Sequence, residues 1–202
     1  MVHITKKDLD KDNYYKDSGI NTTEEITCEE NLGYIKFKKS VITTKSIILG
    51  LGCGIEAGYG IEAGYGIKAG CGIEAGYGIE AGDGIEAGYG IKAGYGIEAG
   101  CGIEAGYGIK AGCGIEAGLS IICKGALKFS YQLFAGTCIW REITEEDLIV
   151  GCGKSETDGK IVLGNLKETG NVPEEIDNIK IIDGKKYKLV EDALNVKENN
   201  NG

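Results

Sequence analysis

The stretch from Cys53 to Gly118 reads CGIEAG-YGIEAG-YGIKAG-CGIEAG-YGIEAG-DGIEAG-YGIKAG-YGIEAG-CGIEAG-YGIKAG-CGIEAG, a unit of six residues repeated eleven times without interruption. Each unit places Ile third and Ala fifth, with Glu or Lys between them. A fixed short period is the sequence signature of a repeat architecture. The repeat therefore decides the fold of the chain.

The Ile-Glu-Ala part of the unit alternates apolar, charged and apolar residues, which is the periodicity of a β-strand. A helix is excluded because two glycines in every six residues would each cost about 1 kcal/mol relative to alanine. We expect the Gly-X-Gly part to supply the bend, since glycine reaches backbone angles closed to other residues. Strands this short must stack, with about 4.8 Å between neighbours. The sequence predicts an all-β fold, a parallel β-solenoid with Ile and Ala inside.

The number of units in one coil is open from these residues. Three units give a triangular coil of about 18 residues, and two give a flattened coil of about 12 residues. A triangular coil stacks one all-acidic column and one mixed column: Glu62, Glu80, Glu98, Glu116; and Glu56, Glu74, Lys92, Lys110. A two-sided coil instead alternates the charge sign, which cross-strand electrostatics favours: Glu56, Lys68, Glu80, Lys92, Glu104. We favour the triangular coil because a two-sided coil has a thin core.

The run GIEAGYGIKAGYGIEAG, which ends at Gly100, resembles the short-period β-helices, namely the hexapeptide left-handed helices and the bactofilin-like polymer-forming proteins. It is similar above all to a group of GIEAG-repeat proteins of low-GC bacteria and their phages. The hexapeptide acyltransferase pattern matches poorly, because it has a small residue where this repeat has Tyr, Cys, Asp or Leu. The resemblance covers roughly residues 33–139 and implies an architecture rather than an activity.

We expect three parts in the chain: a polar N-terminal arm (1–30), the solenoid (31–139) and a C-terminal appendage (140–202). In the arm, 2–15 could form a short helix and 24–30 a strand. Counting by sixes from Ile55 places Phe37, Thr43 and Leu49 at the Ile position, and Val41 and Ile47 at the Tyr position.

The same phase continues after the perfect repeat. It places Ile121, Leu127, Leu133 and Ile139 at the Ile position, and Cys123, Phe129 and Ala135 at the Ala position. Phe129 and Phe134 are expected to seal the end of the core. The whole solenoid would then have roughly six coils and a length on the order of 30 Å.

The C-terminal appendage shows weaker signals. Thr144 could cap a short helix, and residues 160–166 alternate like a strand. Residues 179–189 predict a hairpin with Asp183-Gly184 as its turn. The last residues, 198–202, are expected to be disordered.

The net charge of −9 is concentrated in the repeat, which carries −6, and in the tail from Arg141, which carries −5; residues 1–52 are neutral, and Lys124 and Lys128 add +2. Such a surface argues against direct nucleic-acid binding and is compatible with a basic partner. The N-terminus has no apolar signal core, and no run is long enough to span a membrane. We therefore expect a cytoplasmic protein, in the host cell if the chain is phage-encoded.

The eight cysteines do not form a zinc-binding pattern, because no Cys-x-x-Cys spacing occurs. Cys53, Cys71, Cys101 and Cys113 stand where the repeat usually has Tyr. They are interpreted as reduced, small apolar residues, and we expect no metal and no cofactor.

Two sets of residues are candidates for binding a partner: the glutamates Glu62, Glu80, Glu98 and Glu116, and the tyrosines Tyr59, Tyr77 and Tyr95. Like charges about 4.8 Å apart repel, so stability alone would favour lysines in such a column. The column is either an acidic comb for a basic groove or a face that keeps the protein soluble. The tyrosines face inward by strict alternation, but a glycine corner can reverse them. Asp83 at the equivalent position suggests that this site reaches water.

Catalysis finds little support in the sequence. His3 is the only histidine, whereas hexapeptide acyltransferases rely on a histidine within the solenoid. No nucleophile–base spacing is recognisable, and no Gly-Lys-Ser/Thr marks a phosphate loop. The repeat also lacks the threonine ladders typical of ice-binding solenoids. We expect a protein that is not an enzyme.

The resemblance and the acidic charge together suggest a binding protein that blocks a basic macromolecule. The expected partner is a protein with a basic surface, such as a host CRISPR-type nuclease whose nucleic-acid channel is basic. The alternative is a bactofilin-like scaffold module that polymerises end to end. Self-association, handedness and the role of the appendage stay open.

Overall fold

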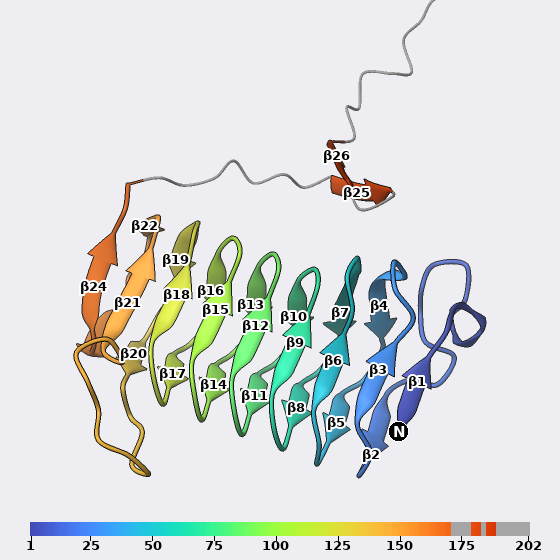
Figure 1. Cartoon of the computed structure of the whole chain (residues 1–202), viewed down its shortest axis with the longest axis horizontal. Coiled ribbons are helices and arrows are strands. Elements are labelled where there is room, and N and C mark those ends of the chain that lie inside the picture. The colour runs from blue at the N-terminus through green and yellow to red at the C-terminus, as the bar shows by residue number, and fades with distance from the viewer. Residues whose placement is uncertain (171–178, 183–184, 189–202) are drawn as a thin grey trace, which may run out of the picture.

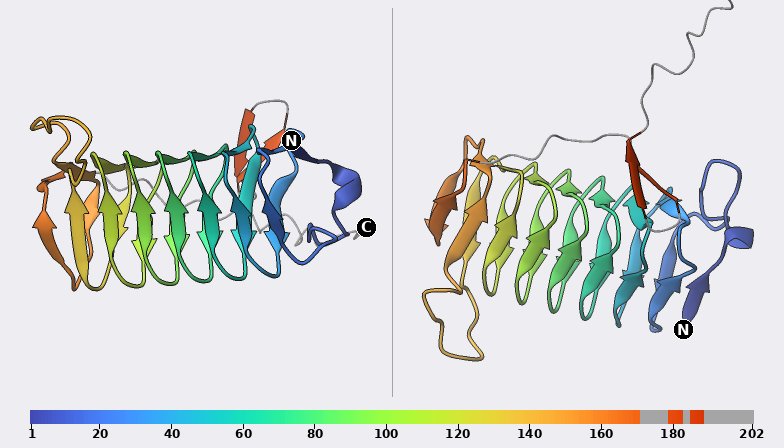
Figure 2. Two further views of the ribbon diagram at one scale, coloured as in Figure 1. Left: turned by 90° about the horizontal axis from the view of Figure 1, so that it is seen from below. Right: turned by 45° about the horizontal axis from the view of Figure 1, so that its top comes forward.

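The computed structural model describes residues 1–170 together with the backbone of residues 179–182 and 185–188. Within residues 1–170 the chain winds into a rod of stacked coils, each with three short strands that contribute to three parallel sheets (Figure 1). The views from below and at 45° show the same ladder of coils along the rod (Figure 2). The predicted all-β, parallel β-solenoid is confirmed, and the described residues contain no α-helix.

The first sheet has nine strands in spatial order: β1 (Val2–Ile4), β3 (Ile26–Cys28), β6 (Ile47–Leu49), β9 (Ile67–Ala69), β12 (Ile85–Ala87), β15 (Ile103–Ala105), β18 (Ile121–Cys123), β21 (Ile149–Cys152) and β24 (Asn165–Glu168). The second sheet has seven: β4 (Gly33–Phe37), β7 (Cys53–Ala57), β10 (Ile73–Ala75), β13 (Ile91–Ala93), β16 (Ile109–Ala111), β19 (Ala126–Lys128) and β22 (Lys154–Ser155). The third sheet has eight: β2 (Ile20–Thr22), β5 (Val41–Thr43), β8 (Ile61–Ala63), β11 (Ile79–Ala81), β14 (Ile97–Ala99), β17 (Ile115–Ala117), β20 (Gln132–Ala135) and β23 (Lys160–Leu163).

The register of the perfect repeat confirms the triangular coil. Ile73 pairs with Ile55 on one side and with Ile91 on the other, so equivalent residues are 18 apart. The two-sided alternative, with its alternating charges, is wrong because Glu56 pairs with Glu74 rather than with Lys68. Every Ile of the repeat is at most 1% exposed, so three faces give the core enough depth to bury this side chain completely.

The glycines of the repeat act differently from the expectation. None of them has a positive φ; the described glycines that do are Gly33, Gly52, Gly136, Gly164 and Gly170. The glycine after each Ala is required by close approach instead: a Cβ added to Gly94 would collide with the carbonyl oxygen of Gly76 in the coil before it. Tight stacking at the corner, rather than an unusual backbone angle, therefore excludes side chains at this position.

The N-terminal residues 1–30, expected as an arm, form part of the solenoid. They contribute β1, β2 and β3, and Ile4, Ile20 and Ile26 enter the core. The expected strand in 24–30 is present as β3. The short helix expected in 2–15 is wrong, because this range begins with the strand β1 and its one helical turn is the 3₁₀ helix η1 (Lys6–Asp8). Counting by sixes missed these strands because Ile20 pairs with Val41, 21 residues later, so the first coil is longer than the repeat.

The phase expected for 37–49 is also wrong. Val41 and Ile47 pair with Ile61 and Ile67 and so occupy the Ile position. Phe37, Thr43 and Leu49 pair with alanines of the next coil. The coil before the perfect repeat has 20 residues, and its two extra residues shift the count. Gly52, with φ 71°, lies at the corner before β7 where the chain returns to phase.

After the repeat, the expected phase is confirmed as far as Ala135. Ile121, Leu127 and Leu133 pair with isoleucines, and Cys123 and Ala135 with alanines. Ile139 leaves the solenoid and is almost fully exposed, and Val150 takes the next Ile position. The chain makes a loop at 136–148 before it rejoins the first sheet (Figure 1).

The two phenylalanines do not jointly seal the core. Phe129 is buried, but Phe134 pairs with Glu116 and so faces outward, half-buried. Residues 149–168 then add a further coil, so the solenoid runs from Val2 to Glu168 rather than over 31–139. The helix expected after Thr144 is a single turn in which the Asp147 amide donates to the Thr144 carbonyl.

The strand expected in 160–166 is divided into β23 and β24 at Gly164, which has φ 129°. The hairpin is confirmed as the antiparallel pair β25 (Ile179–Ile182) and β26 (Lys185–Lys188). Its expected turn, Asp183-Gly184, and the expected disorder at 198–202 lie outside the described residues.

Candidate interaction surface

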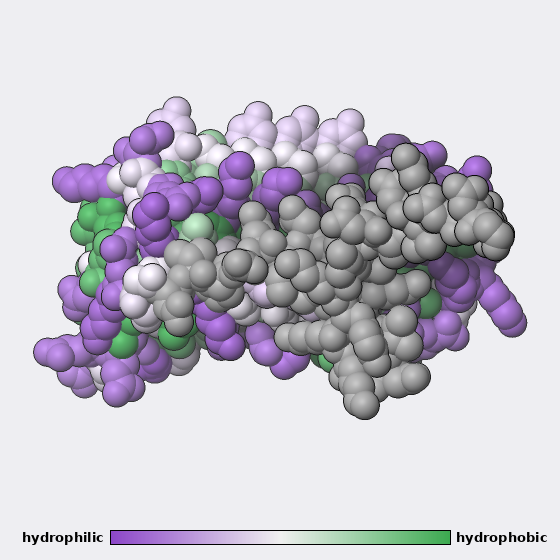
Figure 3. All heavy atoms as spheres, turned by 90° about the horizontal axis from the view of Figure 1, so that it is seen from above, coloured by the Kyte–Doolittle hydropathy of each residue, from purple (hydrophilic) through white to green (hydrophobic). Residues whose placement is uncertain are grey.

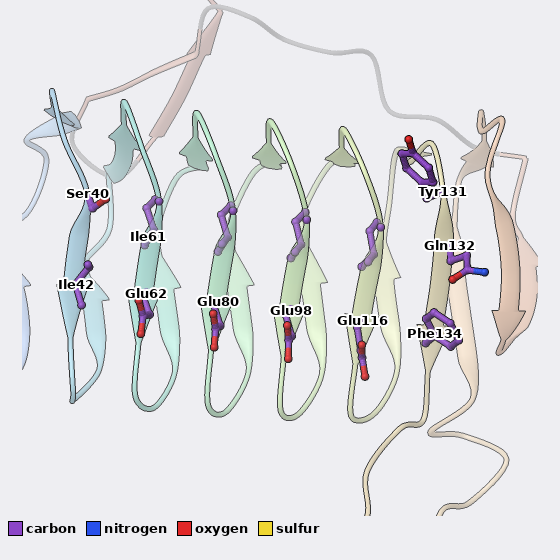
Figure 4. Close-up of a pocket in the computed structure, with 17 residues that line it drawn as sticks. Ser40, Ile42, Ile61, Glu62, Glu80, Glu98, Glu116, Tyr131, Gln132 and Phe134 are labelled. Atoms are coloured by element: carbon purple, nitrogen blue, oxygen red, sulfur yellow. The ribbon is translucent and has the colours of Figure 1, made fainter.

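The four candidate glutamates form one column on the outer face of the third sheet. Glu80 pairs in register with Glu62 and with Glu98, and Glu98 pairs with Glu116 (Figure 4). These four residues are called the acidic column below. Their side chains project from successive coils at the spacing of a parallel ladder, about 4.8 Å. No ion pair joins any of them to a residue in the described part of the chain.

The other two faces balance much of their charge internally. On the second sheet, the ammonium of Lys36 lies 3.6 Å from Glu56, and that of Lys92 lies 3.5 Å from Glu74. On the first sheet, the Lys68 ammonium donates to Glu86 at 2.8 Å. Opposite charges on neighbouring strands stabilise a sheet, whereas like charges oppose it. Among the described residues, the acidic column is thus distinguished from the other faces because no cation pairs with it.

The repulsion within the column is evident at Glu98. Partial burial, together with the negative charges of Glu80 and Glu116, raises the pKa of the Glu98 carboxyl. A raised carboxyl pKa means that the folded protein holds the charged form of Glu98 at a disadvantage. The column therefore stores repulsion that a cationic partner would relieve.

A shallow groove of about 540 Å³ follows the acidic column along the rod (Figure 4). A row of glycines forms part of its lining: Gly60, Gly78, Gly96 and Gly114. The ends of the groove are less charged, with Ser40 and Ile42 at one end and Tyr131, Gln132 and Phe134 at the other. The arrangement can accept a long cationic element that lies parallel to the rod.

The candidate tyrosines form a ladder at the corner that precedes the third sheet. The ring centroids of Tyr59 and Tyr77 are 5.2 Å apart, and those of Tyr77 and Tyr95 are 5.3 Å apart. All three side chains are exposed, so the corner turns them outward, which answers the question that the sequence left open. Since each tyrosine precedes a glycine of the groove, the ladder and the acidic column border the same row of glycines.

The remaining two corners are less aromatic. At one of them Tyr65 and Asp83 are both exposed, as expected for a position that reaches water. At the other, Tyr89 and Tyr107 stack with centroids 5.6 Å apart but are half-buried. Burial raises the pKa of Tyr34, which lies over this second sheet, to about 12. The exposed tyrosines are therefore concentrated beside the acidic column.

The residues considered for other chemistry are dispersed. His3 lies on the outer side of β1, where its Nδ1 is 2.9 Å from the Thr27 hydroxyl. All eight cysteines are free, with Cys53 completely buried and Cys71, Cys101 and Cys113 partly exposed at corners. Within the described residues there is no group of three His, Cys, Asp or Glu placed to hold a metal ion. No helix in that part of the chain is long and apolar enough to cross a membrane.

Sequence reasoning missed the ends of the groove. Ile42 and Phe134 continue the acidic column, because they pair with Glu62 and Glu116 respectively. The sequence could have placed Phe134 in the column, because it stands 18 residues after Glu116 in the same phase. The sequence could not have placed Ile42 there, because the 20-residue coil displaces it from that phase.

In comparisons with known proteins, no family model, no curated protein and no solved structure matches the chain.

Proposed function

We propose that this chain is a non-enzymatic binding protein that places its acidic column against a basic surface of a macromolecular partner and blocks that surface. The observation that carries the proposal is the column of four glutamates, with which no cation of the described residues pairs. Isolated from the ion pairs of the other two faces, it keeps its full charge available to a partner.

Two further features support a protein partner. The exposed tyrosine ladder supplies amphipathic aromatic groups of the kind enriched at protein interfaces. The short, hydrogen-bonded coils form a rigid support, so little conformational entropy would be lost when the face binds. A rod that carries regularly spaced carboxylates imitates the charge pattern of a nucleic-acid backbone.

The partner that we propose is a nucleic-acid-guided nuclease of the CRISPR type, and the chain would be a phage or mobile-element inhibitor of this host defence. Such nucleases hold nucleic acid in a positively charged channel. The support for this identity is the resemblance to phage GIEAG-repeat chains together with charge complementarity.

The test is a binding measurement with a purified guide-loaded nuclease of this type, together with a DNA-cleavage assay. Reversal of the column (Glu62→Lys, Glu80→Lys, Glu98→Lys, Glu116→Lys) should abolish both binding and inhibition. Raising the salt concentration should weaken binding by the unmodified chain.

The matched control reverses four exposed acids away from the column that form no ion pair within the described residues: Asp12→Lys, Glu30→Lys, Asp83→Lys and Glu104→Lys. Both variants change the net charge by the same amount. If binding depended only on the net charge and not on the acidic column, both variants would lose affinity for the nuclease equally. That result, or binding that survives reversal of the column, would contradict the mechanism.

The scaffold alternative is less well supported. A filament that grows end to end needs two accessible ends, and Leu9, in the loop between β1 and β2, is buried against the first coil. The N-terminal end would have to open before a second copy could stack on it.

A further inference from the structure

The two ends of the solenoid differ in how far the described residues cover the core. At the N-terminal end, residues 8–16 fold over the first coil, and Leu9 is only 7% exposed. The Tyr15 amide donates to the Lys36 carbonyl at 2.8 Å, and the Lys36 amide donates to the Asn13 carbonyl at 2.9 Å. These bonds occupy the free edge of β4, and the Tyr15 ring packs on Phe37 with centroids 5.2 Å apart. Both the core and one sheet edge are therefore covered at this end.

At the C-terminal end, none of the residues that the structure describes covers the core of the last coil. Leu166, which continues the core column from Val150, is 44% exposed. On β23, Val162 lies at a shift in register and is 45% exposed, whereas Leu163 pairs with the outward-facing Phe134 and is 38% exposed. Figure 3 shows hydrophobic residues gathered at the left end of the rod, over this coil. The Ser155 amide donates to the Glu168 carboxylate at 2.6 Å, which ties β22 to β24 but leaves the apolar side chains uncovered.

Among the described strands, those at this end have one edge without a partner. β22, β23 and β24 are the terminal members of the second, third and first sheets. The parallel ladder continues to Gly170, whose φ of 71° turns the backbone out of the strand direction. Free edges with apolar neighbours are surfaces that other strands join readily.

The charge of this end suits association of identical chains. Residues 149–170 contain three lysines and three acids, a net charge of zero, although the whole chain carries −9: Lys154, Lys160 and Lys167; Glu156, Asp158 and Glu168. Two copies would repel one another through most of their surface, above all through the acidic columns. The last coil is a neutral end at which they can meet.

We propose that two copies of the chain join at their C-terminal ends to form a closed dimer. A two-fold axis normal to the first sheet places β24 of the two copies antiparallel, and sets β22 of each copy against β23 of the other. The interface is self-complementary, as a two-fold interface must be. Leu166 and Val162 are buried in it. Assembly stops at two copies because residues 8–16 cover the opposite end, and the acidic columns are left exposed on both arms of the dimer. This inference does not depend on the proposed function.

The experiment is light scattering and sedimentation velocity on the full chain over a range of concentrations. The expected species has a mass of 42.8 kDa, twice the 21.4 kDa of one chain. The variant Val162→Lys/Leu166→Lys should raise the dissociation constant of the dimer by about tenfold or more, as is typical when an apolar centre of an interface is lost. Circular dichroism should be unchanged, since both side chains are already largely exposed in one copy.

A matched control is Ile48→Lys. Ile48 is 42% exposed, close to the value for Leu166, but it lies on the outer face of β6, away from both ends. This variant should remain a dimer. Equal loss of the dimer in both variants would overturn the proposal, since it would indicate a general effect of added lysines.

A photo-crosslinking residue at position 162 identifies the contact. The crosslinked dimer should form from position 162 and not from position 27, near the N-terminal end. A ladder of higher species would overturn the proposal in favour of a filament. A monomer at all concentrations would overturn it as well.

Discussion

Glu80 and Glu98 are register partners on β11 and β14, with no cation paired to either among the described residues. The equivalent positions of the second sheet, Glu74 and Lys92, form an ion pair at 3.5 Å. The same six-residue unit thus produces opposite electrostatics on two faces of one rod. The difference in charge between the faces comes from one position in each unit, the residue between Ile and Ala, which is either Glu or Lys.

Glu98→Gln should stabilise the folded protein by about 0.2–1 kcal/mol at neutral pH, because it removes two like-charge contacts on neighbouring strands. The measurement is the midpoint of urea unfolding. Glu74→Gln is the control, and it should give no gain because it removes the ion pair with Lys92. A loss of stability in Glu98→Gln would show that its neighbours do not repel it.

The pH dependence of this effect has a definite sign. The folded-state pKa of Glu98 is raised above its unfolded value of about 4.5, so at high pH the charged carboxylate reduces stability. The penalty should diminish as the pH falls through the folded pKa and vanish below about 4.5. The difference between the unmodified chain and Glu98→Gln should therefore shrink on acidification, and a constant difference would contradict the assignment.

Gly94→Ala should destabilise the solenoid strongly, by about 2 kcal/mol or more, because the added Cβ meets the Gly76 carbonyl in a stack that cannot relax locally. Gly96→Ala is its matched control. The Cβ at position 96 would lie 3.5 Å from the Gly114 carbonyl oxygen, an ordinary contact, and the backbone angle is accessible to alanine.

We expect Gly96→Ala to be neutral, or to stabilise by up to about 1 kcal/mol through a smaller unfolded-state entropy. Thermal unfolding of the two variants side by side provides the measurement. Equal effects in both variants would exclude steric stacking as the reason for the glycine after alanine.

Ile97→Ala should cost about 2–5 kcal/mol, since Ile97 is 1% exposed in the middle of the rod and its removal leaves a cavity. Ile122→Ala makes the same chemical change at a position that is 42% exposed and should cost less than about 0.5 kcal/mol. Denaturant unfolding monitored by circular dichroism distinguishes the two. Similar costs at both positions would mean that the core is not packed as the register indicates.

The loop at 136–148 should depend on the charge of Asp147. Arg141 donates two hydrogen bonds to this carboxylate, at 2.7 and 2.9 Å, and the amide and hydroxyl of Thr144 donate two more, both at 2.8 Å. The Arg141 and Thr144 bonds lower the pKa of Asp147 from 3.8 to about 2. The stabilisation is present above the unfolded pKa and is lost as the pH falls through the folded value.

Asp147→Asn should therefore make the loop more susceptible to proteolysis at neutral pH, with cleavage confined to 136–148. In the unmodified chain, the NMR signal of the Asp147 side-chain carboxyl carbon should titrate near pH 2, below the ordinary value of 3.8. Glu142→Gln, a change at an exposed neighbour, should leave both measurements unaltered. An Asp147 carboxyl that titrates at or above pH 3.8 would contradict its role.

The acidic column could be read from the sequence because 18-residue spacing and the triangular coil together fix the neighbours of each glutamate. The sequence predicted that the tyrosines recur at one corner, but it left open whether their side chains face inward or outward. Strict alternation points a side chain inward, but the vertex of a triangular coil has no interior volume for a tyrosine ring. The direction of Tyr77 is therefore a property of the corner rather than of the strand pattern.

The sequence by itself determined the inward isoleucines, because the direction of a side chain follows from a period of two within a strand. It also determined the parallel stacking, because strands of three residues are stable only when successive coils share a ladder. Whether the glutamates stack on one another depends on the number of units in a coil, which the sequence left open and the register decided. Only the tertiary structure decided where the irregular coils join the stack. Residues 1–30 enter it with a spacing of 21, Val41 moves to the Ile position through a coil of 20, and Ile139 leaves it. Hydrogen bonds between distant coils choose these registers, and corners absorb the extra residues, so no local period records them.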